Sequence, residues 1–405
     1  MDHSSSSPHT SRQTIVVTDG EQRSALALVR SLGRAGHTVH VCSASGRSLA
    51  GASRFAATDT ALPDALDDPD AFADALRAHV TNVGAQVLIP MTEAALLATL
   101  PRRTTFAARI PFADADVFAG ISDKQRVLAE AQRVGIAAPS QHVLSSPSDA
   151  AILDRSALRY PLVVKPTRSV AGDGKERAKF SVIHVANAEA LDAVLTRIDS
   201  RAYPLLLQQR VVGPGVGIFV LVWDGQLVAA FSHRRLREKP PSGGVSVYRE
   251  SFPLDASLLE RSRALLDAFQ WQGVAMVEYK VDEATGTPYL MEINGRFWGS
   301  LQLAIDAGVD FPTLLLAADA GESPTPVTSY RTDVRSRWWW GDVDHLIARM
   351  TRSPEALALP PGAPSRGAAL RDFFTNDHRD VNEIRQPDDP RPFLRETQLW
   401  LQSLI

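Results

Sequence analysis

Two segments decide the fold: Val277-Glu278-Tyr279-Lys280 and Met291-Glu292-Ile293-Asn294-Gly295-Arg296. They belong to two largely apolar runs, 276–281 and 288–293, on either side of Thr285-Gly286. Strand-like runs joined by a turn that contains glycine predict a β-hairpin. Because alternate side chains of a strand share a face, we expect Glu292, Asn294 and Arg296 to point the same way.

The predicted hairpin brings a second carboxylate to this face. A turn centred at Thr285 places Glu278 directly opposite Glu292, and like charges in that position are unfavourable unless a cation lies between them. Hard oxygen ligands suit Mg²⁺, which also takes phosphate oxygens and water. A solvent-exposed hairpin face with alternating charges is the alternative, but the flanking strands are very apolar. The pattern therefore predicts a metal site of Glu278, Glu292 and Asn294.

Two lysines and a glycine-containing loop point to a phosphate site. Lys165 ends a buried strand, where a lysine can reach a phosphate as a point charge. Lys124 lies in the first turn of a helix that we expect Ser122 to cap, and a cation there opposes the helix dipole and needs a partner. The loop that begins at Ser169 is flexible enough to offer backbone N–H groups to phosphates. Chance surface placement of the lysines and an ordinary hairpin turn are the alternatives.

A basic run over residues 231–239 predicts an anion site. If this run is a regular strand, Arg235 and Arg237 share one face with His233. The following loop contains Gly243 and Gly244, which permit close approach of the backbone to a ligand. Arginines beside such a loop suit a carboxylate or its acyl phosphate. The alternative is a solvated edge strand.

Strands that alternate with helices over residues 13–112 predict a small doubly wound domain with a parallel sheet. The loop after its first strand lacks the G-x-G-x-x-G pattern, which makes a nicotinamide dehydrogenase a poor interpretation. Arg23 and Glu93 follow strands whose carboxyl ends are where open α/β sheets bind ligands. Glu93 could hold a substrate amine, with a surface loop acid as the alternative.

Composition narrows the class of protein. The 405 residues include 43 Lys and Arg, 46 Asp and Glu and one cysteine, for a net charge of −3. A nucleic-acid binder normally carries a basic surplus, and a disulfide framework needs more cysteines. We identify neither a signal peptide nor a membrane helix, so we expect a cytoplasmic, multi-domain protein with no membrane partner. Residues 1–12 are predicted to be a disordered tail.

The order of these elements resembles a known superfamily. They are Ser122-Asp123-Lys124, Val164-Lys165-Pro166, a glycine-containing loop, Gln208-Gln209-Arg210-Val211, Gly213-Pro214-Gly215, Glu278 and Glu292-Ile293-Asn294-Gly295-Arg296. This series resembles the ATP-grasp superfamily, and most closely its predicted carboxylate–amine ligases. The resemblance implies an α/β fold class: an N-terminal doubly wound pre-ATP-grasp domain over 13–112, then a two-subdomain α+β ATP-grasp fold over 113–321. Residues 322–405 form a C-terminal extension that the resemblance does not cover.

The resemblance also implies roles for individual residues. Lys124 and Lys165 resemble the lysines that hold ATP phosphates, and Ser169 lies in the loop over them. Residues 208–211 resemble the hinge whose backbone meets adenine, although Gln209 stands where the family usually has glutamate. Glu278, Glu292 and Asn294 resemble the Mg²⁺ ligands, for which Mn²⁺ is an alternative ion. Arg296 resembles the arginine that steadies the transferred phosphate.

The resemblance implies an ATP-dependent ligase that joins a small-molecule carboxylate to an amine through an acyl phosphate and releases ADP. A biotin-carboxylase-like subunit and a non-catalytic, ATP-binding regulatory module are the alternatives. No nucleic-acid partner is expected, and a homodimer is left open.

Overall fold

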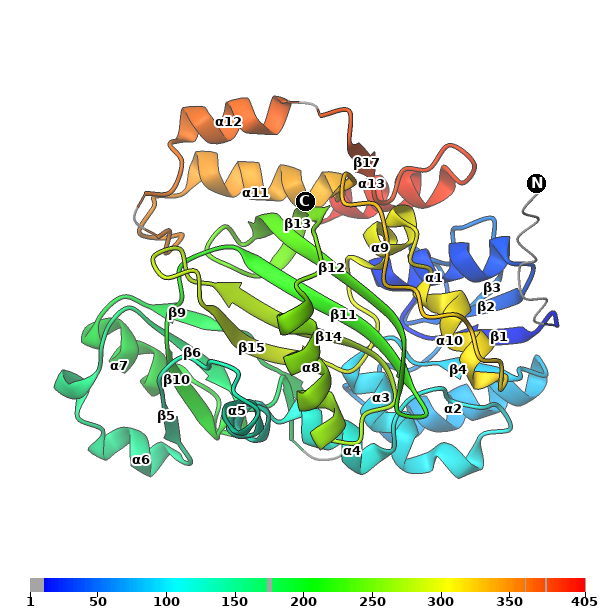
Figure 1. Cartoon of the computed structure of the whole chain (residues 1–405), viewed down its shortest axis with the longest axis horizontal. Helices are drawn as coiled ribbons and strands as arrows, with labels where there is room; N and C mark the ends of the chain where they lie inside the picture. Colours follow the sequence, from blue (N-terminus) through cyan, green and yellow to red (C-terminus); the bar gives the residue numbers. More distant parts are fainter. Residues whose placement is uncertain (1–10, 173–176, 361, 376, 405) are drawn as a thin grey trace.

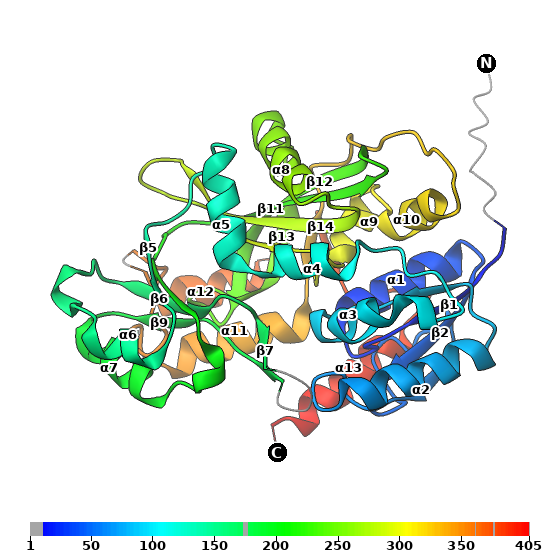
Figure 2. The same ribbon diagram turned by 90° about the horizontal axis from the view of Figure 1, so that it is seen from below.

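The structure, a computed structural model, describes residues 11–172, 177–360, 362–375 and 377–404. A large sheet occupies the centre, with the N-terminal domain on one side and a smaller sheet on the other (Figures 1 and 2). Within the described ranges, no single helix is long and apolar enough to cross a membrane. Among the described residues, one pair of helices is together long and apolar enough, namely α9 (Leu301–Ala307) and α10 (Phe311–Asp319), and the chain bends by 90° between them.

The N-terminal domain is built on a parallel sheet, as its strand–helix alternation predicts. The strand order is β3-β2-β1-β4. Its elements are β1 (Thr14–Val17), α1 (Arg23–Arg34), β2 (Thr38–Ser43), β3 (Ala56–Ala61), α2 (Pro69–Asn82), β4 (Val87–Ile89), α3 (Glu93–Thr99) and a 3-10 turn at Leu100–Thr105. The β-branched run of β1 is almost wholly buried, which makes it the centre of this core. Helices α1 and α3 begin after β1 and β4, at the carboxyl edge of the sheet.

The smaller sheet is antiparallel and has the order β5-β10-β6-β9. The subdomain around this sheet contains α4 (Ala115–Ser122), α5 (Lys124–Arg133), β5 (Gln141–Leu144), α6 (Pro147–Ile152), β6 (Leu162–Pro166), β9 (Ile183–Val185), α7 (Ala188–Arg197) and β10 (Leu205–Gln209). A separate two-stranded sheet consists of β7 (Val170–Ala171) and β8 (Ala178–Lys179). The cap predicted at Ser122 is wrong, because Ser122 is still the last residue of α4. Asp123 caps α5 instead and accepts hydrogen bonds from the backbone N–H groups of Gln125 and Arg126.

The large sheet has the order β15-β14-β11-β12-β13-β16-β17. Its elements are β11 (Gly215–Trp223), β12 (Gln226–Lys239), β13 (Val245–Ser251), α8 (Ala256–Ala268), β14 (Gly273–Val281), β15 (Pro288–Asn294), β16 (Arg335–Arg337) and β17 (Asp380–Asn382). A hydrogen bond of 2.8 Å between Tyr279 Oη and Ser262 Oγ joins α8 to one face. On the other side, α9 and α10 pack against α1 of the N-terminal domain.

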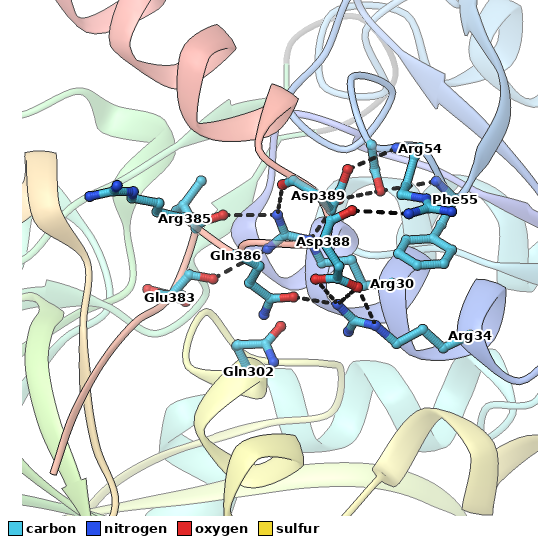
Figure 3. A network of polar contacts seen from close by, with 12 residues as sticks. Arg30, Arg34, Arg54, Phe55, Gln302, Glu383, Arg385, Gln386, Asp388 and Asp389 are labelled. Atoms are coloured by element: carbon cyan, nitrogen blue, oxygen red, sulfur yellow. Dashed lines mark hydrogen bonds and ion pairs between the residues drawn. The ribbon is translucent and has the colours of Figure 1, made fainter.

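The C-terminal extension fastens the large sheet to the N-terminal domain. It contributes β16, β17, α11 (Trp339–Thr351), α12 (Arg366–Phe374) and α13 (Arg391–Gln402). The fully buried Arg30 of α1 pairs with Asp389 at 2.9 Å and donates to the Ile384 carbonyl (Figure 3). Trp340 of α11 stacks on Trp400 of α13 at 4.0 Å between ring centroids. The extension is therefore part of the main structure.

Candidate functional site

The β14–β15 hairpin has the register that the sequence predicts. Glu278 lies directly opposite Glu292, and a bulge shifts the pairing only beyond Glu278. Asn294 donates a hydrogen bond of 3.0 Å to Glu292 Oε1, and Arg296 donates one of 3.1 Å to Asn294 Oδ1. The hairpin thus gathers two carboxylates, one amide and one guanidinium.

Lys124 and Lys165 reach this hairpin from the smaller subdomain. Lys124 Nζ lies 3.5 Å from Glu292 Oε2 and donates to Ser169 Oγ at 2.9 Å. Lys165 Nζ donates to the Met291 carbonyl at 3.3 Å. Both lysines are buried, so neither is a surface lysine placed by chance. Ser169 lies beside Lys124, while residues 173–176 of the same loop lie outside the described residues.

The charges of the site shift its ionisation constants in opposite directions. Burial raises the pKa of Glu292, but Lys124 and the other neighbouring cations outweigh it and hold the pKa at about 2. Burial also raises the pKa of Glu278, and the charge of Glu292 adds to this although Arg235 opposes it. Burial lowers the pKa of Lys165 to about 8. The site therefore holds one carboxylate that is firmly ionised and a second that needs a cation.

The donor set fits Mg²⁺. Glu278 and Glu292 face each other and Asn294 adds an amide oxygen, all hard oxygen donors. No group of three or more His, Cys, Asp or Glu side chains suited to a metal occurs among the described residues. Two carboxylates and an amide leave the remaining coordination positions to water and phosphate oxygens, which is how Mg²⁺ is usually bound beside nucleotides.

Glu93 connects the N-terminal domain to the same site. It is the first residue of α3, and burial raises the pKa of its carboxyl group, while Lys124 and Arg296 lower it. The Val170 backbone N–H, in the loop that follows Ser169, hydrogen-bonds to this carboxylate. Glu93 Oε1 is buried and has no hydrogen-bond partner among the described residues. These contacts contradict the alternative of a surface loop acid.

The expectation that Arg235 and Arg237 share one face is wrong. Arg235 pairs with Arg249 across β13, whereas Arg237 pairs with Tyr248, the residue before it. The extra residue between them forms a β-bulge, which turns the second arginine to the opposite face. Arg235 donates to Glu278 Oε2 at 2.6 Å and to Glu238 Oε1 at 2.8 Å, so it lies at the site.

Arg237 points away from the site toward α11. Its Nε and Nη2 atoms donate to the two oxygens of the buried Asp342 at 2.7 and 2.6 Å. Its guanidinium also lies 4.3 Å from the centroid of the Tyr248 ring. Arg237 thus holds α11 on the sheet, and its contacts among the described residues do not include Glu278 or Glu292.

The glycine loop after β12 supports Arg235. The Gly244 carbonyl accepts a hydrogen bond from Arg235 Nη1 at 3.1 Å. A Cβ atom on Gly244 would lie 2.5 Å from the Lys239 carbonyl oxygen, and Gly243 has a φ of +131°. Glycine is therefore required at both positions by the turn itself, which shapes the wall of the site behind Arg235.

The segment 208–211 runs between the smaller and the large sheet, where the resemblance places a hinge. Gln208 is buried and donates to Gln141 at 3.3 Å, and Gln209 accepts from Ser140 Oγ at 2.9 Å. Arg210 donates to the Ser242 carbonyl at 3.4 Å, and Val211 is half-buried. The backbone from β10 to β11 is therefore held at both ends.

Arg23 meets residues that the sequence analysis did not select. It pairs with Glu383 of the extension and lies 4.0 Å from the centroid of the Trp338 ring. Glu383 also lies 2.6 Å from Arg249 of β13. The alternation of β13 could have identified Arg249 once its pairing with β12 was known. No sequence signal indicates Glu383, which is 360 residues from Arg23.

Comparison with known proteins agrees with this geometry. Residues 201–340, which include Glu278 and Glu292, match a family described as "ATP-grasp in the biosynthetic pathway with Ter operon". No match was found among curated protein sequences.

Solved structures extend the likeness to most of the chain. An L-amino acid ligase from Bacillus licheniformis is 20% identical, with 76% of this chain and 74% of that chain covered and a TM-score of 0.59. An N5-carboxyaminoimidazole synthetase from Staphylococcus aureus with ADP is 16% identical, with 80% of each chain covered and a TM-score of 0.60. A biotin carboxylase from Campylobacter jejuni is 15% identical, with 81% of this chain and 75% of that chain covered and a TM-score of 0.60. Together with the match of residues 201–340 to an ATP-grasp family, this likeness shows that the chain has the ATP-grasp fold.

Proposed function

We propose that the protein is an ATP-dependent carboxylate–amine ligase that works through an acyl phosphate. The observation that carries the proposal is the meeting of Lys124 and Lys165 of one subdomain with Glu278 and Glu292 of the other. Buried cations beside paired carboxylates suit a nucleotide's phosphates and their Mg²⁺. The backbone of residues 208–211 supports adenine in this proposal.

In the first step, an oxygen of the substrate carboxylate attacks the γ-phosphorus of ATP. The new O–P bond forms as the bond to the bridging oxygen of ADP breaks, and ADP leaves. Lys124 and Lys165 hold the phosphates, and Arg296 steadies the transferring group. Glu278, Glu292 and Asn294 would hold Mg²⁺, which would supply positive charge against the negative charge that develops on the phosphates.

In the second step, the amine nitrogen attacks the carbonyl carbon of the acyl phosphate. The C–O bond to phosphate breaks, an amide forms, and the amine's proton passes to water or to the released phosphate. Glu93, whose Oε1 atom has no hydrogen-bond partner among the described residues, would accept a hydrogen bond from the amine in this proposal. Arg235 balances the charge of Glu278 beside the reacting carboxylate.

An isotope experiment tests the reaction class. ADP release is screened over amino acids and other carboxylates with amines, and the best pair is repeated with an ¹⁸O-labelled carboxylate. The attacking oxygen stays bonded to phosphorus, so the label is expected in inorganic phosphate, together with ADP and an amide. Release of AMP and pyrophosphate would contradict the proposal. ADP formation that requires bicarbonate and biotin would favour the biotin-carboxylase-like alternative. Binding of ATP without its hydrolysis would favour the regulatory module.

A further inference from the structure

A buried polar cluster extends the metal-site face of the large sheet. Arg235, which bonds to Glu278, pairs across the strands with Arg249. Directly opposed residues of neighbouring antiparallel strands share a face. Arg249 therefore lies on the same face as the site, one strand further from the metal carboxylates, and none of its side chain is exposed.

The extension places a carboxylate on this arginine. Glu383 follows β17, and its Oε2 atom lies 2.6 Å from Arg249 Nη2 and also pairs with Arg23 of α1. Only 1% of the Glu383 side chain is exposed. One carboxylate thus lies between an arginine of the sheet and an arginine of the N-terminal domain, beside the site.

Several polar atoms in this cluster lack partners. Glu383 Oε1 and Arg249 Nε are buried and have no hydrogen-bond partner among the described residues, and the same is true of His233 Nε2. His233 is next to Arg235 on the same face, two residues along β12. Buried polar groups are nearly always satisfied by protein, ordered water or a ligand, since leaving them unpaired is costly. Glu383 therefore offers a free acceptor and Arg249 a free donor within one buried cluster.

We propose that Glu383 is a substrate-binding residue that accepts a hydrogen bond from the ammonium group of an amino acid, while Arg249 Nε donates to an oxygen of the same molecule. A free carboxylate oxygen beside a free guanidinium N–H matches a zwitterion, which carries both charges. This inference rests on the proposed ligase function, and it makes the C-terminal extension part of the substrate site.

The test is Glu383→Gln. The two arginines will hold the amide oxygen, which turns the NH₂ group toward the ligand, where it repels an ammonium. Turnover is measured as ADP release with each of the twenty common amino acids and with its 2-hydroxy analogue, which lacks the ammonium group. The wild type is expected to turn over the amino acid faster than its 2-hydroxy analogue. In Glu383→Gln the ratio of the two rates should fall at least tenfold, while the affinity for ATP stays unchanged.

Asp389→Asn is the matched control. Asp389 is also a buried carboxylate of the extension on an α1 arginine, but its partners are Arg30, Ser53 and Arg54 of the N-terminal domain (Figure 3). Its substitution should lower the unfolding temperature and leave the preference for the amino acid unchanged. Equal effects of Glu383→Gln on both classes of compound would mean that Glu383 only fastens the extension, and would overturn the proposal.

Two further measurements keep the proposal open to refutation. If Glu383→Gln does not fold, Arg249→Lys keeps a cation beside Glu383 and removes the Nε donor, and it should raise the KM for the amino acid at least tenfold. An unchanged KM would overturn the proposal. If the wild type forms no product with any pair of substrates, the proposed ligase function fails, and calorimetry with the same amino acids then tests the role of Glu383 by itself. Weaker binding of an amino acid to Glu383→Gln than to the wild type would support that role. No binding of any amino acid to the wild type would overturn it.

Discussion

At the residue scale, Glu292 and Glu278 differ although they face each other. The cations around Glu292 hold its pKa at about 2, so it is ionised at any ordinary pH. The pKa of Glu278 is raised by burial and by Glu292. A divalent cation between them would favour the charged form of both, because an opposite charge a few ångströms away lowers the pKa of a carboxyl group.

Glu292→Gln is expected to abolish ADP formation while the protein still folds. The amide keeps the shape and the hydrogen bond with Asn294, but removes the charge that Mg²⁺ needs. ADP release and thermal unfolding are measured together at ordinary Mg²⁺. Glu130→Gln, which alters a pair with an exposed arginine on α5, is the control and should retain activity. Full activity of Glu292→Gln would remove the metal site from the proposal.

Lys165→Ala is expected to weaken ATP binding about 10- to 150-fold, because a charge-assisted contact contributes about 1.5–3 kcal/mol. The dissociation constant is measured by calorimetry. An unchanged value would mean that the lysine at the end of β6 is structural.

The pH dependence of ATP binding follows from the same lysine. Burial lowers the pKa of Lys165 to about 8, so the side chain is charged below pH 8 and neutral above it. Phosphate binds the charged form, so ATP affinity should fall as pH rises through 8, and ATP binding should take up a proton there. Calorimetry in buffers of different ionisation enthalpy measures this uptake. The same uptake in Lys165→Ala would assign it to another group.

At the element scale, one extra residue in β12 separates two arginines that regular alternation would keep together. Opposite β13, Arg235 and Arg237 pair with consecutive residues, Arg249 and Tyr248. Consecutive residues of a strand point to opposite faces. The bulge therefore gives one arginine to the site and the other to the contact with α11.

Substitution of the two arginines by methionine should separate these tasks. Arg235→Met is expected to lose most turnover with ATP affinity nearly intact. Arg237→Met should lower stability by about 1–3 kcal/mol, because the buried Asp342 loses a bidentate partner and keeps its bond with Arg337. Turnover per folded molecule and urea unfolding are measured for both. Loss of turnover at full stability in Arg237→Met would return that residue to the site.

At the scale of the whole molecule, two of the ion pairs that attach the extension to α1 lie in different environments. Arg30 and Asp389 have no exposed side-chain surface. Arg34, one helical turn after Arg30 on α1, pairs with Asp388 of the extension, and the side chains of these two residues are 36% and 48% exposed. A buried pair that loses one partner leaves an uncompensated charge, whereas water solvates an exposed charge.

Arg30→Met should therefore cost about 3–5 kcal/mol of the free energy of unfolding. Arg34→Met, the matched control on the same helix, should cost less than about 1 kcal/mol. Urea unfolding followed by circular dichroism gives both values. Equal losses would show that exposure does not distinguish the two pairs.

The sequence alone determined the features that depend on local pattern. The period of two and the turn at Thr285-Gly286 predict the hairpin and the opposition of Glu278 and Glu292, and the alternation of strands with helices predicts the parallel sheet. These features follow from residues close in sequence, whose spacing limits the available geometry. The resemblance, carried by several short motifs in order, added the two-subdomain fold, which the structural comparisons confirm.

Only the tertiary structure decided how distant segments meet. Regular alternation could not show the bulge before Arg237, because a bulge is defined by pairing with another strand. No local pattern indicates that Glu383 lies between Arg23 and Arg249, since the contact with Arg23 joins residues 360 positions apart. Such contacts are set by the packing of whole layers, and a single charged residue in an extension carries no periodic signal of its partner.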